Sequence, residues 1–378
     1  MSIFLLIRVI NATADKVWSV LTVPAKGLSM LKEADIKFPE IPFRKTAVLV
    51  VAGLALYLVY LYLAGLNNVK FVLLHANYRF LGLAVLVSLA SNLFHAAGWW
   101  ILLKDGMKYR ISLLNAYLLY LSSTFFVNLI PPAAISGEVA KIYFVEKTTP
   151  EARFDKTAAA CLMSRILETL PTTVIVVLGV IYLALYYSVP CWVLILCLIV
   201  AGVLILIALA ALAVMLNNPL LRRVAAWSFR LLGMVFKGYD FSARAEHIDL
   251  VLKQFDASLR SITDRPWLVA VSLFFIFVAW GFDLAVAYLA FLTIEYHASV
   301  LLITIIFSII VVLQLVPTFV PGDLGLIDGL MTVLYIALGI SRDASTGATI
   351  MIRLVTLWFL TTLGAAVSIY LVKAYGKK

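Results

Sequence analysis

The sequence predicts an all-α polytopic membrane protein, arranged as an inverted repeat of three transmembrane helices plus a re-entrant helical hairpin per half. Three observations lead to this class. The 378 residues are 64% hydrophobic and only 13% charged, whereas soluble domains are about half apolar and about a quarter charged. Apolar runs of membrane-spanning length recur along the chain. Proline and glycine interrupt two of the apolar stretches, and such breaks tend to occur where the backbone is buried in protein or lines a cavity.

The charge and the cysteines exclude several other classes. A net charge of +10 would suggest nucleic-acid binding in a soluble protein. In a membrane chain it instead fixes topology and meets anionic lipid headgroups at the cytoplasmic face, so we expect no nucleic-acid partner. The three cysteines and four histidines show no CxxC or HExxH spacing, so we expect no metal site and no cofactor.

Six apolar runs are long enough, at roughly 17 residues or more, to cross the hydrocarbon of a bilayer. They are Thr46–Leu66, Phe80–Leu103, Thr157–Tyr187, Cys191–Leu216, Trp267–Thr293 and Gly347–Val372.

Two further stretches are pairs of medium-length segments. In the first, Ser112–Ile130 and Ala133–Val145 flank Pro131 and Pro132. In the second, the breaks between Ser299–Val316 and Leu324–Leu338 are Pro317, Pro321 and Gly322.

Lysine and arginine predict the orientation of the chain. Seven lie in residues 1–45 and eight in 217–265, and the loops before 112 and after 145 are also basic. Basic loops face the cytoplasm. Both termini are therefore expected there, and 112–145 becomes a re-entrant hairpin from the inside. The loops around 299–338 are poor in basic residues, so that hairpin enters from the outside. The alternative is that each hairpin arm is a full span.

The predicted organisation has three parts. Residues 1–45 form a cytoplasmic interfacial segment, whose role the sequence leaves open. Residues 46–187 form the first repeat with hairpin 112–145, and residues 191–372 form the second repeat with hairpin 299–338. A cytoplasmic loop, 217–265, carries apolar residues at helical spacing and is expected to be amphipathic, either against anionic lipid or as a linker between the halves.

Matching spacings support the repeat. Pro131 precedes Glu138 by seven residues, and Pro321 precedes Asp328 by seven. Glu138 lies 27 residues before Arg165. In the second half Asp328 lies 25 residues before Arg353, and Gly137 and Gly329 flank the two acids.

Ionisable side chains at membrane depth are costly, about 2.5–3.5 kcal/mol each on insertion scales, and indicate function by default. Glu138 with Arg165 and Asp328 with Arg353 are expected to pair, either to line a translocation path or to fix each hairpin to the next span. The remaining candidates for the path are Glu168, Asp323, Asn128, Gln314 and Asp283. Asp283 is either a proton or cation site or is hydrogen-bonded to a neighbouring Ser or Tyr. His95 is expected to be a packed, hydrogen-bonded histidine.

The residues from Asn128 to Glu138, the run from Ser164 to Glu168, the run from Val316 to Gly329, and Arg353 resemble the flippase-like, lysylphosphatidylglycerol-synthase transmembrane-domain family. The likeness covers about Lys45 to Ala374. It implies roles for Glu138, Arg165 and Asp328 in moving lipid headgroups. Two positions depart from the family's usual pattern, with Pro-Pro-Ala at the first break in place of Pro-Gly and Asp328 in place of Glu.

Translocation of a phospholipid or lipid-linked headgroup is therefore the leading hypothesis. The alternative is a membrane scaffold or accessory subunit for a lipid-modifying enzyme or glycosyltransferase. An enzyme is not expected, because no catalytic constellation of nucleophile and base is evident. The oligomeric state stays open, with a homo-oligomer as one option.

Overall fold

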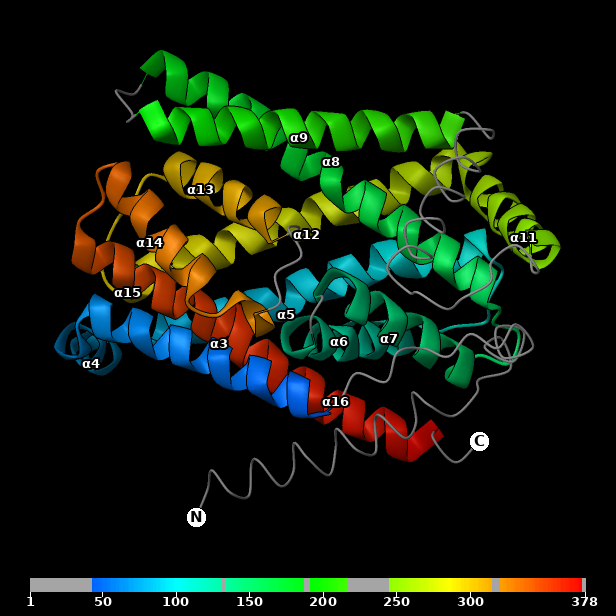
Figure 1. Ribbon diagram of the computed structural model, residues 1–378, viewed down its shortest axis with the longest axis horizontal. Helices are drawn as coiled ribbons and strands as arrows, with labels where there is room; N and C mark the ends of the chain where they lie inside the picture. Colours follow the sequence, from blue (N-terminus) through cyan, green and yellow to red (C-terminus); the bar gives the residue numbers. More distant parts are fainter. Residues whose placement is uncertain (1–42, 131–132, 187–190, 217–244, 315–319, 376–378) are drawn as a thin grey trace.

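The computed structural model describes residues 43–130, 133–186, 191–216, 245–314 and 320–375, and every regular element within them is a helix (Figure 1). Four helices in these ranges are long and apolar enough to span a membrane. They are Tyr78–Gly106, Phe154–Tyr186, Pro266–Thr293 and Arg342–Tyr375. The prediction of an all-helical membrane protein is confirmed at this level.

The first part of the chain alternates long helices with one shorter pair. Its elements are α3 (Phe43–Ala64), α4 (Leu66–His75), α5 (Tyr78–Ile101), the π-helical turn η1 (Leu102–Gly106), α6 (Leu113–Leu129), α7 (Ala133–Thr148) and α8 (Phe154–Tyr186). Side-chain hydrogen bonds cap the N-termini of two helices. The Asn77 side chain accepts from the Arg79 amide at the start of α5, and the Ser112 side chain accepts from the Asn115 amide at the start of α6. The sequence analysis did not anticipate α4.

The second part of the chain contains further helices and helical turns. They are α9 (Cys191–Leu216), α11 (Ala245–Thr263), α12 (Pro266–Thr293), α13 (Val300–Leu313), the 3-10 turn η3 (Pro321–Asp323), α14 (Leu326–Ala337), α15 (Arg342–Arg353), the π-helical turn η4 (Leu354–Phe359) and α16 (Leu360–Tyr375). The helices agree with the predicted spans to within a few residues, and the last span begins five residues earlier than Gly347.

The centre of the molecule is the pair α5 and α12, which pack along their length (Figure 1). Ser272 on α12 donates its hydroxyl hydrogen bond to the Gly98 carbonyl on α5, at 3.0 Å. Small residues at such a crossing let two backbones approach closely. Around this pair, α6 packs on α16 and α13 packs on α8.

The outer surface is apolar where the helices face away from one another. Leu58, Leu86, Leu178 and Phe274 are all at least 60% exposed, and they come from α3, α5, α8 and α12. A soluble protein rarely leaves so many large hydrophobic side chains in water. This surface is the one expected of a protein whose solvent is lipid.

The loop 217–265, which the sequence predicts to be cytoplasmic, is described only from residue 245 onward, where it forms α11. Its apolar face packs on protein, since Leu259 and Ile262 are buried in a core cluster with residues of α5, η1 and α8. Packing on protein fits the linker between the halves, one of the two interpretations of this loop, and contact with anionic lipid stays a prediction. Residues 217–244, most of 1–45, Pro131, Pro132 and Pro317 lie outside the described residues.

Candidate functional site

A polar cavity of about 340 Å³ lies between the two parts of the chain. Residues of α5, α6, α7, α8 and α12 to α16 line it. Its ionisable lining side chains are His95, Lys141, Arg165, Asp283, Asp323 and Arg353. Charged groups from segments far apart in the sequence therefore meet in one space.

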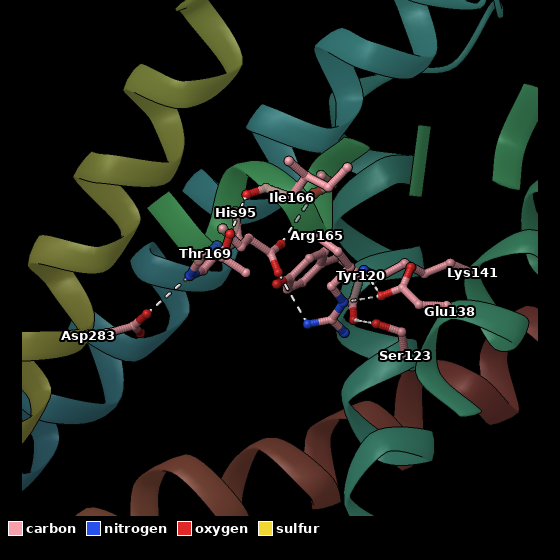
Figure 2. Close-up of polar contacts among 11 residues, drawn as sticks. His95, Tyr120, Ser123, Glu138, Lys141, Arg165, Ile166, Thr169 and Asp283 are labelled. Carbon is pink, nitrogen blue, oxygen red and sulfur yellow. Dashed lines mark hydrogen bonds and ion pairs between the residues drawn. The ribbon is translucent and has the colours of Figure 1, made fainter. Parts of the chain in front are cut away.

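The first charged cluster joins α7 to α8. The Arg165 guanidinium donates from Nε to Oε1 of Glu138 at 2.6 Å and from Nη1 to Oε2 of Glu168 at 3.2 Å. Ser164 donates to the other oxygen of Glu168. Figure 2 shows Arg165 reaching Glu138 across the gap between the helices. The pairing expected from the 27-residue spacing is present.

Lys141 completes this cluster, although the sequence analysis did not include it among the candidates. Its side chain is 2% exposed, and its ammonium lies 3.1 Å from Oε1 of Glu138. The same ammonium lies 4.6 Å from the centre of the Tyr120 ring, close enough for a cation–π contact. The available signal was its position three residues after Glu138, on the same helical face.

The charges of the first cluster balance, with two cations against two carboxylates. One Glu138 oxygen serves both Arg165 and Lys141. The other, Oε2, is buried without a hydrogen-bond partner among the described residues. The Arg165 side chain is 38% exposed, so this cluster is paired but open on one side to the cavity.

The second charged cluster joins α14 to α15. Arg353 donates from Nε to Oδ1 of Asp328 at 3.0 Å and also donates to the Gly322 carbonyl. The other Asp328 oxygen accepts from the Gly325 amide at 2.8 Å, at the start of α14. A carboxylate at a helix N-terminus also interacts favourably with the helix dipole. The Arg353 and Asp328 side chains are 5% and 1% exposed, so this pair is closed.

A third polar group lies at the crossing of α5 and α12. Asp283 accepts hydrogen bonds from the Ser91 hydroxyl and from Nε2 of His95, the latter at 3.1 Å. Figure 2 shows His95 and Asp283 facing each other from the two helices. Asp283 thus has the serine partner that the sequence analysis offered as one alternative, and it has His95 in addition.

The remaining candidates are distributed around the cavity. Asn128 and Gln314 line it, and the Asn128 amide donates to the Thr361 hydroxyl on α16 at 2.8 Å. Asp323 is 6% exposed and lines the cavity. A buried position on η3 leaves it in contact with the cavity rather than with bulk solvent.

The local structure explains why glycine stands at two positions near the predicted hairpin breaks. Gly137 on α7 faces α6 so closely that a Cβ there would collide with the Val127 side chain. Gly322 has φ 59°, in the left-handed region that favours glycine. Pro321 starts the same 3-10 turn. No group of His, Cys, Asp and Glu that could hold a metal ion is found within the described part of the chain.

Comparison with known proteins gives the family. The model of the lysylphosphatidylglycerol synthase TM region matches residues 48–364. The chain belongs to this family. Its relatives include UPF0104 membrane proteins of three archaea, and no solved structure matches it significantly.

The similarity to these relatives extends over most of each chain. The Pyrococcus horikoshii protein is 24% identical, covering 85% of this chain and 95% of its own length. The Methanocaldococcus jannaschii protein is 22% identical over 90% and 98%, and a Methanothermobacter thermautotrophicus protein is 27% identical over 66% and 73%. The family is one of multi-pass membrane proteins, and the names of these relatives state no substrate.

Proposed function

We propose that the protein moves a phospholipid or lipid-linked headgroup between the leaflets of the cell membrane. The observation that carries this proposal is the cavity of about 340 Å³ lined by Lys141, Arg165 and Arg353. Arg165 is the most exposed of the three, at 38%, and its guanidinium suits the phosphate of a headgroup. The exposed apolar exterior would leave the acyl or isoprenoid tails in lipid.

The packing supports an inverted repeat. The contact of α6 with α16 corresponds to that of α13 with α8, and α5 and α12 occupy equivalent places and contact each other. His95 and Asp283 are each 17 residues from the start of their helices, so equivalent positions would meet at the axis between the halves. Inverted repeats build transporters whose site lies near the midplane, between broken segments.

The two helix pairs fit re-entrant hairpins. The helices α6 (17 residues) and α7 (16 residues) pack against each other, as do α13 (14 residues) and α14 (12 residues). At a rise of about 1.5 Å per residue, each arm is shorter than the roughly 30 Å hydrocarbon core. In this proposal the α6–α7 hairpin enters from the cytoplasm, with both termini there, and the α13–α14 hairpin enters from outside.

The two charged clusters suggest how the halves alternate. The Arg165 side chain is 38% exposed, and the Arg353 side chain is 5% exposed. In the proposed cycle Arg165 receives the headgroup from the cytoplasmic side while Arg353 stays paired. Rocking of one half against the other would then open Asp328–Arg353 and close Glu138–Arg165.

The test is lipid movement in liposomes that contain purified protein and a labelled phospholipid. The rate is read from the label that becomes accessible to a membrane-impermeant quencher. We expect movement faster than in empty liposomes, and at least about a tenfold loss in Arg165→Ala, the factor that corresponds to about 1.4 kcal/mol. The matched control is Arg260→Ala, which removes an arginine paired with Asp256 outside the cavity.

Equal rates in wild type and Arg165→Ala, with both proteins folded, would rule out this path. No movement in wild type for phospholipids or lipid-linked substrates, with and without a pH gradient, would favour the scaffold alternative instead.

A further inference from the structure

A second cavity, also of about 340 Å³, lies at the junction of η1, α8, α11 and α12. It shares no lining residue with the central cavity. Its charged lining residues are Lys108, Arg153, Lys156, Arg265 and Asp155, four cations against one carboxylate. We call it the basic pocket. The cations come from three separate stretches of the chain, so the fold, and not a local run of charge, gathers them.

The single carboxylate does not balance the pocket. Asp155 accepts from Arg153 at 3.1 Å and from the Ser258 hydroxyl at 3.2 Å. Lys108, Lys156 and Arg265 make no ion pair with any carboxylate of the described residues, and the Arg265 guanidinium donates to the Asp105 carbonyl at 2.9 Å. Like charges held together cost free energy, and an anion in the pocket would offset this cost.

Two helix N-termini add to the positive potential. Arg153 directly precedes α8, which is 33 residues long, and Arg265 directly precedes α12, which is 28 residues long. Each N-terminus carries about half a positive charge from the helix dipole, although the first residue of α12, Pro266, has no N–H. Anions, phosphate above all, bind at such ends.

The frame of the basic pocket is held by hydrogen bonds. The Tyr109 hydroxyl accepts from the Arg153 amide at 2.8 Å and lies 3.1 Å from the Arg153 carbonyl, to which it donates. Lys108 adopts φ 62°, an uncommon conformation for a lysine. The amides of Met107 and Tyr109, on either side, bond to carbonyls of η1. The backbone that carries Lys108 and Arg153 is therefore fixed by these bonds.

We propose that the basic pocket binds a phosphate group, carried by an anionic phospholipid or free in solution. Trp267 is 54% exposed two residues after Arg265, and tryptophan favours the headgroup level of a bilayer. The pocket therefore lies where a lipid phosphate is within reach. This site goes beyond translocation and does not depend on it, because its binding is measured without any lipid movement.

The experiment counts lipids bound to the purified full chain by native mass spectrometry. Phosphatidylglycerol is the probe, phosphatidylcholine, whose phosphate is offset by choline, is the net-neutral comparison, and inorganic phosphate is the competitor. The pocket variant is Lys108→Asn with Lys156→Gln, since asparagine tolerates positive φ. The control variant is Lys70→Gln with Lys373→Gln, two exposed lysines outside both cavities.

We expect the wild type and the control variant to bind phosphatidylglycerol equally. The pocket variant should bind it about tenfold more weakly, which corresponds to a loss of about 1.4 kcal/mol of binding free energy. Displacement by inorganic phosphate would assign the site to phosphate from either source, and resistance to it would assign the site to the lipid. Equal binding to the pocket and control variants, at equal thermal stability, would overturn the proposal. If the double variant unfolds, Lys156→Gln alone gives the same comparison.

Discussion

At the scale of single residues, two arginine–carboxylate pairs have the same chemistry and different surroundings. Glu138 and Arg165 are 17% and 38% exposed, while Asp328 and Arg353 are 1% and 5% exposed. Breaking a buried pair leaves an uncompensated charge, which costs more than the pair itself contributes. The two pairs should therefore respond differently when their acids are neutralised.

We predict that Asp328→Asn destabilises the protein by about 3–5 kcal/mol, because Arg353 then stays buried without a counter-charge. Glu168→Gln should cost less, since Arg165 keeps Glu138 and reaches the cavity. Thermal unfolding of the two purified variants under one set of conditions measures the order. A larger loss in Glu168→Gln would contradict the burial argument.

At the scale of elements, close helix pairs hold the charged groups in place. The α6–α7 pair depends on Gly137, because its missing side chain leaves room for Val127. The α6–α16 pair is joined by the Ser122 and Ser368 hydroxyls at 2.8 Å, and by Asn128 and Thr361. Small and hydroxyl-bearing residues at these contacts are typical of helix packing in membranes.

Gly137→Ala should lower the thermal stability, because the added methyl group overlaps Val127 and overpacking costs about 1–3 kcal/mol. Gly281→Ala on α12 is the matched control, since a Cβ there meets nothing within 4 Å. Alanine also has the higher helix propensity, so the control should be neutral or slightly stabilised. Unfolding temperatures check both. Equal effects at the two positions would show that the α6–α7 contact adjusts without cost.

At the scale of the whole molecule, charged groups from both parts of the chain line one cavity. Their side chains are exposed to different extents. Arg165 is accessible to the cavity, whereas Arg353 is covered by its own pair. If the halves alternate, this asymmetry describes one of two states. A chemical probe that enters from water should then distinguish the two arginine positions.

We expect Arg165→Cys to react with a thiol reagent of low membrane permeability at least about tenfold faster than Arg353→Cys. The expectation follows from burial, because protected groups react only when the structure opens. Both variants are made in a protein whose native cysteines are replaced by serine. These are Cys161, Cys191 and Cys197. Mass spectrometry of the labelled protein gives the rates. Equal labelling rates would mean that both clusters open equally. That result would contradict a state in which only the Arg165 side is accessible.

The sequence predicted six spans, and the described residues contain four helices of membrane-spanning length and apolarity. That much was predictable because apolar length and helical composition are local properties. It also predicted both ion pairs, since repeated spacings placed Glu138 near Arg165 and Asp328 near Arg353. It did not predict that Asn128 would bind Thr361, 233 residues away. Periodicity within one helix does not specify which distant helix it will face.

What the sequence determined by itself is the solvent, the helical class and the charged positions, because insertion into lipid depends on composition and on the cost of each ionisable group. Only the tertiary structure decided the partners. It brought Ser91 and His95 to Asp283, buried Lys141 beside Glu138, and gathered the four cations of the basic pocket. The physical reason is that these contacts join separate helices, so they exist only once the helices pack against one another.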